Sequence, residues 1–143
     1  MIVLESDHAG FDLKKKIKKW LQKNNIQYVD CGAETLNAND SYVDFAKKAI
    51  ETYSQEHNQD AHKLILICGS GVGMSIVANR SSSIRAVLAY TTKQVMQARQ
   101  HNNVNCLCIG ARNTGYLKSK QMIKTFLTTD FLGGKHLDRI KSI

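Results

Sequence analysis

The cysteine best placed for chemistry opens a glycine-rich segment, Cys68-Gly69-Ser70-Gly71-Val72-Gly73, which lies between an apolar run and a helical pattern. Glycine lets the backbone turn sharply and approach a ligand closely. The N–H groups at the start of a helix bind anions, and such a helix start also tends to lower the pKa of a thiol. Cys68 is therefore predicted to be reactive, and the alternative is a small buried core residue.

The same segment carries no nucleotide-binding signature. No Lys-Ser or Lys-Thr pair follows it, as a P-loop requires. Ile76 occupies the last position of a GxGxxG pattern counted from Gly71, so the dinucleotide fingerprint is absent as well. A nucleotide-binding module is therefore disfavoured.

Two further segments place polar side chains at the ends of predicted elements. Asp7-His8 follows the first apolar run and could hydrogen-bond hydroxyls or a phosphate, although Asp7 would also suit a helix N-cap. His101 follows a helical pattern that ends near Arg99, where it could act in acid–base chemistry or simply favour the helix C-terminus. The competing histidines are His136 and, in a polar stretch expected to be solvated, His57 and His62.

A pair of cations lies near the end of the chain. Lys135 and Arg139 are four residues apart on a short predicted helix, so they share one face, while Leu137 and Ile140 lie on another. Two cations on one face would suit a phosphate, and a solvated helix face is the alternative.

Much of the positive charge is concentrated in one segment. The 143 residues carry a formal net charge of +8, with six lysines among residues 14–23. Because Leu13, Ile17, Trp20 and Leu21 recur there at helical spacing, the lysines are predicted to form the solvated face of an amphipathic helix. No nucleic-acid-binding motif accompanies them, so a nucleic-acid partner is not expected. The six are Lys14, Lys15, Lys16, Lys18, Lys19 and Lys23.

The other three cysteines are predicted to fill the core: Cys31, Cys106 and Cys108. No CxxC pair or histidine cluster of metal-ligand spacing occurs, so neither a metal nor another cofactor is predicted. No apolar run approaches the roughly 20 residues of a membrane span. No secretory leader is indicated, and a cytoplasmic protein with reduced thiols and no membrane partner is expected.

Apolar runs alternate with helical patterns along the chain. Strands are predicted over residues 2–4, 26–31, 64–67, 84–88 and 106–109. Helices are predicted over residues 11–24, 42–53 and 74–79, after the N-caps Thr91 and Thr114, and after Gly134. This order predicts an α/β fold of one domain, residues 1–143, with three α/β/α layers in a Rossmann-like arrangement and a five-stranded parallel sheet.

In such sheets, ligands bind outside the carboxyl ends of the strands. Asp7-His8 follows the first predicted strand, the glycine-rich segment follows the third, and Arg112 follows the fifth. The residues with useful chemistry therefore stand where this architecture places a site.

Five segments together match, in order, the pattern of a known family. They are Ser6-Asp7-His8-Ala9-Gly10, Cys68-Gly69-Ser70-Gly71-Val72-Gly73, Arg99-Gln100-His101-Asn102-Asn103, Gly110-Ala111-Arg112 and Gly133-Gly134-Lys135-His136-x-x-Arg139. With these segments the chain resembles the ribose-5-phosphate isomerase B family over essentially its whole length. The galactose-6-phosphate isomerase subunits share the fold and part of the pattern.

The resemblance implies an aldose–ketose isomerase of the non-oxidative pentose phosphate pathway, which interconverts ribose 5-phosphate and ribulose 5-phosphate without metal or cofactor. Cys68 would move a proton between C1 and C2, and His101 would help to open the sugar ring. The substrate and its enediolate oxygen would be held by Gly69, Ser70, Gly71, Val72, Gly73 and Asn102. Sugar hydroxyls and phosphate would be bound by Asp7, His8, Arg112, Lys135 and Arg139. Such a family member is expected to be a homodimer, or a tetramer built from dimers, with each site shared between subunits.

Three residues depart from the family pattern. Lys135 stands where arginine is usual, so a bidentate phosphate contact becomes a point charge and phosphate binding could weaken. Ser70 replaces a common threonine, and Val43 replaces a common proline. These two changes are expected to leave the chemistry intact.

Two other functions stay open. The substrate could be a hexose phosphate such as galactose 6-phosphate or allose 6-phosphate, although the Arg-Gln-His-Asn segment at His101 favours the pentose. A non-catalytic phosphosugar-binding protein is the other alternative. It would be expected to have lost Cys68 or His101, and both are present.

Overall fold

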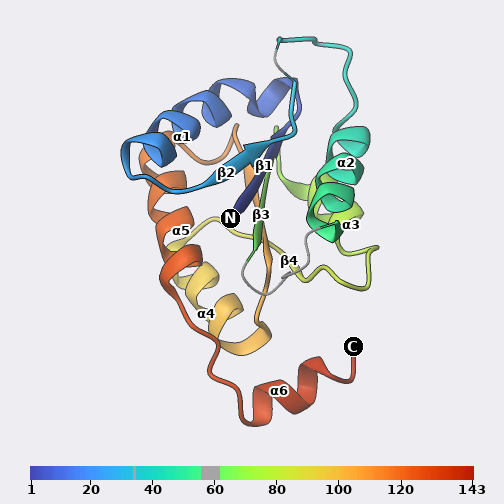
Figure 1. Cartoon of the computed structure of the whole chain (residues 1–143), viewed down its shortest axis with the longest axis vertical. Helices are drawn as coiled ribbons and strands as arrows, with labels where there is room; N and C mark the ends of the chain where they lie inside the picture. Colours follow the sequence, from blue (N-terminus) through green and yellow to red (C-terminus); the bar gives the residue numbers. More distant parts are fainter. Residues whose placement is uncertain (34, 56–61) are drawn as a thin grey trace.

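Figure 1 shows the computed structural model, in which helices flank a parallel sheet of five strands in the order β2-β1-β3-β5-β4. The structure describes residues 1–33, 35–55 and 62–143; His57, a competing histidine in the sequence, lies outside the described residues. The strands are β1 (Ile2–Ser6), β2 (Tyr28–Asp30), β3 (Lys63–Cys68), β4 (Ala86–Leu88) and β5 (Cys106–Gly110). The helices are η1, a 3-10 turn (His8–Gly10), α1 (Phe11–Lys23), α2 (Tyr42–Ser54), α3 (Val72–Ala78), α4 (Thr92–Asn102), α5 (Tyr116–Thr128) and α6 (Lys135–Ile140).

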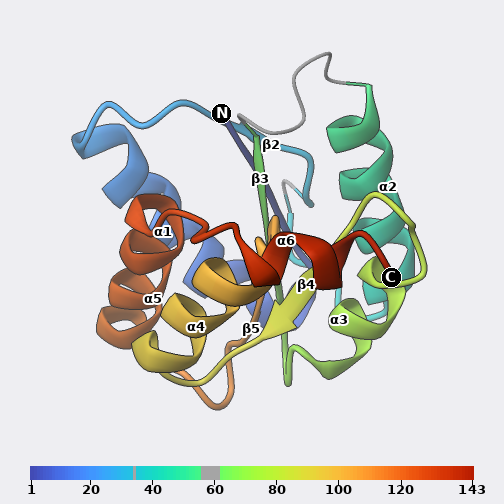
Figure 2. The same cartoon turned by 90° about the horizontal axis from the view of Figure 1, so that it is seen from below.

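Two layers of helices cover the sheet, which confirms the predicted α/β/α fold class (Figure 2). Successive side chains of a strand face opposite sides, so β3 contributes Ile65 and Ile67 to the layer of α1, α4 and α5. Its Leu64, Leu66 and Cys68 belong to the core beneath α2 and α3. A strand buried on both faces explains the unbroken apolar run.

The three cysteines assigned to the core are buried there, as predicted. Cys106 and Cys108 of β5 are fully buried, with their sulfur atoms 3.9 Å apart, and Cys31 follows β2. All four cysteines of the chain carry free thiols.

Of the two threonines predicted to cap helices, Thr91 is confirmed and Thr114 is wrong. Thr91 caps α4 by accepting the N–H of Gln94 at 3.2 Å, in a capping box with the Gln94 side chain. Thr114 does not cap α5, which begins after Gly115. The hydroxyl of Thr114 is buried instead and has no hydrogen-bond partner within the described part of the chain.

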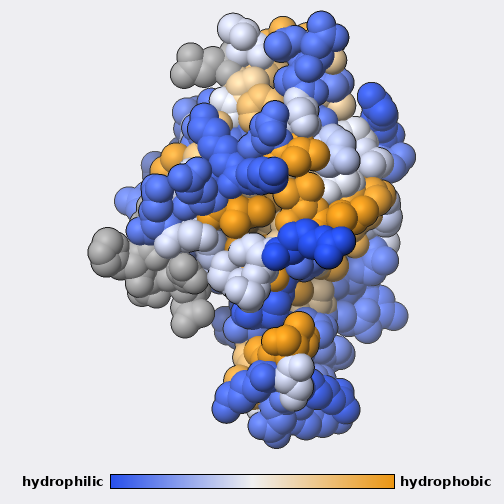
Figure 3. Space-filling view, turned by 90° about the vertical axis from the view of Figure 1, so that its right-hand side faces the viewer, coloured by the Kyte–Doolittle hydropathy of each residue, from blue (hydrophilic) through white to orange (hydrophobic). Residues whose placement is uncertain are grey.

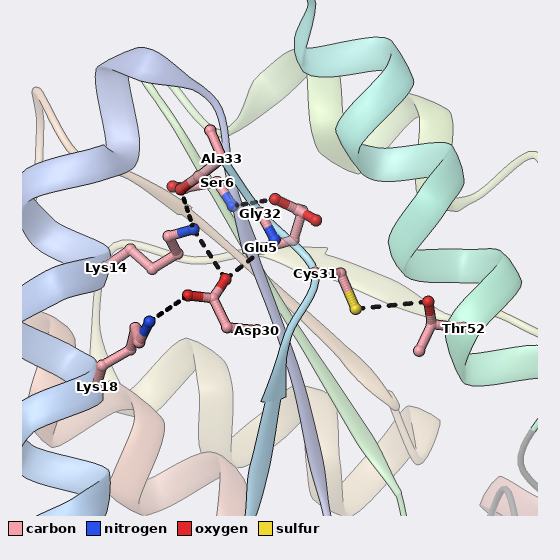
Figure 4. A network of polar contacts seen from close by, with 9 residues as sticks. All are labelled: Glu5, Ser6, Lys14, Lys18, Asp30, Cys31, Gly32, Ala33 and Thr52. Atoms are coloured by element: carbon pink, nitrogen blue, oxygen red, sulfur yellow. Dashed lines mark hydrogen bonds and ion pairs between the residues drawn. The ribbon is translucent and has the colours of Figure 1, made fainter. Parts of the chain in front are cut away.

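Lys14 corrects the prediction of a fully solvated lysine face on α1. It shares a helix face with Ile17 and Leu21, and its side chain is only 1% exposed. Its ammonium group donates to Asp30 Oδ1 at 2.8 Å and to the carbonyl of Ala33 at 3.2 Å, while Lys18 donates to Asp30 Oδ2 (Figure 4). Burial raises the pKa of Asp30, but the two lysines outweigh this effect and hold it below its ordinary value.

The last helix, α6, lies at the end of the molecule and packs against α4 (Figure 1). It has no buried residue. The imidazoles of His136 and His101 stack with ring centroids 4.5 Å apart, and the N–H of Leu132 donates to the carbonyl of Gln100. These contacts attach the C-terminal segment to the end of α4.

In the described ranges, every helix is too short or too polar to cross a membrane.

Candidate functional site

A cavity of about 460 Å³ lies at the carboxyl ends of β1, β3 and β5, where the fold class predicts a ligand site. Eight of the predicted site residues line it: Asp7, His8, Cys68, Gly69, Ser70, Val72, Gly73 and Arg112. Gly71 lies within the same segment. The sequence did not predict three further lining residues, Ala9, Tyr42 and Ile76.

The thiol of Cys68 lies at the inner end of this cavity, at the last residue of β3. It is 4% exposed, and the N–H of Gly71 donates to its sulfur at 3.1 Å. Burial is the strongest influence on the thiol and raises its pKa, whereas backbone N–H groups of Gly71, Met74 and Ser70 lower it. The net shift of the pKa is upward, so the expectation that the helix start would favour the thiolate is wrong.

The glycines of the segment are required by its shape. Gly71 has φ of +80°, and a Cβ there would lie 2.5 Å from Leu88 Cδ1. Gly73 faces the ring of Tyr42, which a Cβ would approach to 2.5 Å. The tight turn thus presents the N–H groups at the start of α3 beside the thiol.

Arg112 supplies a cation at the rim of the cavity. Its side chain is exposed, and its guanidinium lies against Gly69. The backbone N–H of Arg112 donates to the carbonyl of Gly69 at 3.0 Å, which connects the loop after β5 to the loop after β3. An arginine at this place can hold a phosphate in a bidentate contact.

Asp7 performs the structural role that the sequence left open. Its Oδ1 accepts the N–H of Gly10 at 3.0 Å and so caps η1. Burial is the strongest influence on this carboxyl and raises its pKa. Asp7 lines the cavity as well, so capping and ligand contact are compatible.

His8 has a partner that the sequence analysis missed. Its Nδ1 lies 2.6 Å from Oδ1 of Asp40, in the loop before α2. The signal that could have found this loop is topological. The helix that precedes a parallel strand starts at the carboxyl edge of the sheet, so residues before α2 are brought to the site.

Asp7, His8 and Asp40 each place one potential ligand atom within 4.8 Å of the others. The imidazole nitrogen and a carboxylate oxygen of this group already contact each other, and Asp7 accepts a backbone N–H. The prediction that the site needs no metal therefore stays a prediction.

The other predicted residues lie elsewhere. His101 and Asn102 end α4 just before β5 begins at Cys106, whereas Cys68 pairs in register with Gly110 at the far end of β5. Four strand residues span about 13 Å, so His101 lies at the amino edge of the sheet and Cys68 at the carboxyl edge. Lys135 and Arg139 on α6 are attached to the His101 side.

The structure therefore forms two separate clusters in one chain. The thiol cluster contains the cavity residues, and the α4–α6 cluster contains His101, Asn102, His136, Lys135 and Arg139. In the second cluster, desolvation and the neighbouring His101, Lys135 and Arg139 lower the pKa of His136. His62, expected to be solvated, is partly buried beside β3 and belongs to neither cluster.

Comparisons with known proteins place this arrangement in context. A family model described as Ribose/Galactose Isomerase matches residues 2–143. The ribose-5-phosphate isomerase B of Escherichia coli is 32% identical over 142 residues, which cover 99% of this chain and 93% of the relative.

Solved structures agree with the sequence comparison. The ribose-5-phosphate isomerase B of Mycoplasma genitalium with bound ribulose-5-phosphate has a TM-score of 0.93 and 37% identity, and the match covers 99% of this chain and 91% of that one. The enzyme from Thermotoga maritima has a TM-score of 0.91 and 40% identity, with 99% and 94% covered.

Proposed function

Because the chain belongs to the ribose/galactose isomerase family, we propose that it interconverts ribose 5-phosphate and ribulose 5-phosphate through an enediolate. The reaction belongs to the non-oxidative branch of the pentose phosphate pathway. The observation that carries the proposal is the convergence of the Cys68 thiol, the glycine-rich segment and Arg112 in one cavity at the carboxyl edge of the sheet. Residues 1–143 would act as one isomerase domain.

The chemistry requires a base that removes the proton from C2 of the open-chain aldose and returns a proton to C1. During this step the carbonyl moves from C1 to C2, and a proton passes between the two oxygens. Cys68 is the proposed base. The N–H groups of the glycine-rich segment are the proposed donors to the enediolate oxygen, as in an oxyanion hole.

The raised pKa of the thiol has a consequence for this role. An ordinary thiol is already mostly protonated at neutral pH, and burial shifts the pKa of Cys68 further upward because it outweighs the N–H donors. A base must be deprotonated before it can act, so turnover is expected to rise as the pH approaches the pKa of the thiol.

The position of the α4–α6 cluster supports a site that is shared between two chains. His101 is the proposed ring-opening group, and Lys135 and Arg139 are proposed to bind phosphate, yet all three lie at the edge of the sheet away from Cys68. We propose a homodimer, or a tetramer of such dimers, in which this cluster of one subunit completes the thiol cavity of the other.

Lys135 is expected to bind the phosphate less specifically than the arginine that is usual at this position. A lysine ammonium is a point charge, whereas the arginine usual in the family can form two parallel hydrogen bonds. Arg139 keeps the bidentate geometry, and Arg112 supplies a cation from the thiol cluster.

The test is a coupled isomerase assay with ribose 5-phosphate, ribulose 5-phosphate, galactose 6-phosphate and allose 6-phosphate, with and without a chelator. The account predicts turnover of the two pentose phosphates that the chelator does not change. Preference for a hexose phosphate would show that the proposed substrate is wrong. Loss of activity on chelation would show that the reaction needs a metal and that the proposed mechanism is wrong. Binding of the sugars without turnover would identify a non-catalytic phosphosugar-binding protein.

A further inference from the structure

Asp40 is a carboxylate with an almost fully buried side chain, and it lies in contact with His8 of the proposed site. Its side chain is 8% exposed. Oδ1 lies 2.6 Å from Nδ1 of His8 and also accepts the backbone N–H of His8 at 3.2 Å. Oδ2 is buried and has no hydrogen-bond partner within the described residues. Residues 32 positions apart in sequence are thus held together by one oxygen atom.

The contact fixes the chemistry of both ring nitrogens of His8. A carboxylate only accepts, so Nδ1 must carry a proton that it donates to Asp40. His8 also lines the cavity, and Nε2 is the nitrogen left for a ligand. A neutral imidazole held in this way accepts at Nε2, whereas a protonated one donates there.

The charges at this wall decide which form suits an anionic ligand. Asp7 and Asp40 both lie close to His8, and Arg112 is the cation of the same cavity. With His8 neutral, the charges nearest to its ring are the carboxylates of Asp7 and Asp40, and they repel a phosphate dianion that approaches Nε2. With His8 protonated, its charge offsets part of this repulsion, and Nε2–H is a donor for a phosphate oxygen. Cys68 and Tyr42 are the other titratable groups that line the cavity, and both are neutral when protonated.

We propose that Asp40 is a positioning residue that holds the ring of His8 and balances its charge, so that His8 takes up a proton when a tetrahedral dianion binds at Nε2. The ligand class is the phosphate group of the substrate, and in this respect the inference rests on the function proposed above. Protonated Nδ1 is held by Asp40 in both states, so only Nε2 changes.

The experiment uses sulfate, a tetrahedral dianion that does not itself titrate near neutral pH. Nitrogen NMR of the protein labelled with 15N in histidine reports the protonation of each ring nitrogen, and the His8→Gln variant identifies the His8 signals. In the wild type, we expect Nδ1 to be protonated throughout and Nε2 to become protonated as sulfate is added. In Asp40→Asn, we expect sulfate to leave Nε2 largely unprotonated.

A kinetic measurement complements the spectra. Sulfate is expected to inhibit the wild type competitively, and Asp40→Asn is expected to raise its inhibition constant and the KM for ribose 5-phosphate by roughly tenfold to a hundredfold, with a smaller change in kcat. The matched control is Asp44→Asn, which removes the same charge from an exposed position four residues along the chain. It is expected to behave as the wild type.

Each outcome bears on one proposal. If sulfate leaves the His8 nitrogens unchanged while ribulose 5-phosphate changes them, His8 contacts a sugar hydroxyl and the inference is overturned. Equal sulfate inhibition of Asp40→Asn and wild type overturns it as well. If the wild type shows the expected nitrogen spectra but isomerises none of the four sugar phosphates, the proposed function fails and the role of Asp40 as a device for binding dianions stands.

Discussion

Glu5 is a buried carboxyl group that we expect to destabilise the native state at high pH, and its replacement by glutamine tests this expectation directly. The side chain is fully buried in β1. Oε1 accepts the N–H of Ser6 at 2.9 Å, and Oε2 has no hydrogen-bond partner among the described residues (Figure 4). Burial is the dominant influence and raises the pKa of Glu5 from 4.5 to about 8, although Lys14 opposes the shift.

The sign of the effect follows from proton binding. Between pH 4.5 and about 8, the native state keeps the Glu5 proton while the unfolded chain has lost it, so unfolding becomes easier as the pH rises. At about 1.4 kcal/mol for each unit of pKa shift, the group lowers the free energy of unfolding by roughly 3 kcal/mol at pH 7 and by roughly 4–5 kcal/mol above pH 8. Glutamine has the shape of the protonated acid and cannot ionise.

The assay is urea unfolding of the wild type and Glu5→Gln at several pH values from about 5 to 8, at one fixed protein concentration. We expect the difference in the free energy of unfolding between the variant and the wild type to grow by roughly 3–4 kcal/mol from pH 5 to pH 8, in favour of the variant. Glu51→Gln, at an exposed position of α2, is the control and should show a constant difference. A constant difference for Glu5→Gln would mean that Glu5 is ionised throughout and paired with Lys14, and the reasoning would be refuted.

Three further predictions concern the proposed reaction. Cys68→Ala should remove nearly all turnover yet keep the fold, as judged by circular dichroism, and wild-type-like turnover would exclude Cys68 as the base. The kcat of the wild type should rise from neutral to alkaline pH, because burial raises the pKa of this thiol; a profile that is flat there would contradict a thiolate base. Arg139→Ala should raise the KM for both pentose phosphates by about tenfold to a hundredfold, and unchanged values would leave α6 as a solvated cationic face.

The fold could be predicted from the apolar patterns, because β3 and β5 are buried on both faces and therefore form unbroken apolar runs in the sequence. The charges were harder to place. Lys14 has the spacing of a core residue, but its charge led to a solvated assignment, and only the contact with Asp30 on another element makes its burial possible.

The site residues that directly follow the ends of strands could be predicted from the sequence. The residues that reach the site only through contacts between distant parts of the chain could not. Arg112 and Asp7 reach the cavity because their strands end there. Asp40 was missed because its loop carries no pattern of its own. The pKa of Cys68 was given the wrong direction, since the sequence shows the helix start but not how deeply the thiol is buried.

The surface offers one more guide to assembly. Figure 3 shows apolar side chains gathered on one face of the molecule. Val72 and Ile76 of α3 and Tyr42 at the start of α2 are among the exposed large apolar residues. All three also line the thiol cavity, so an apolar surface continues from its rim. Such a surface is typical of a contact between chains.

The most direct test of a site shared by two chains is a mixed dimer of Cys68→Ala and His101→Asn, purified through two different tags and assayed with ribose 5-phosphate. Each variant alone should turn over this cyclic sugar very slowly, because every site lacks either the base or the ring-opening group. In the mixed dimer, one site takes Cys68 from one chain and His101 from the other, so about half of the wild-type activity should return. Activity no greater than that of the parent variants would show that Cys68 and His101 do not act together across two chains.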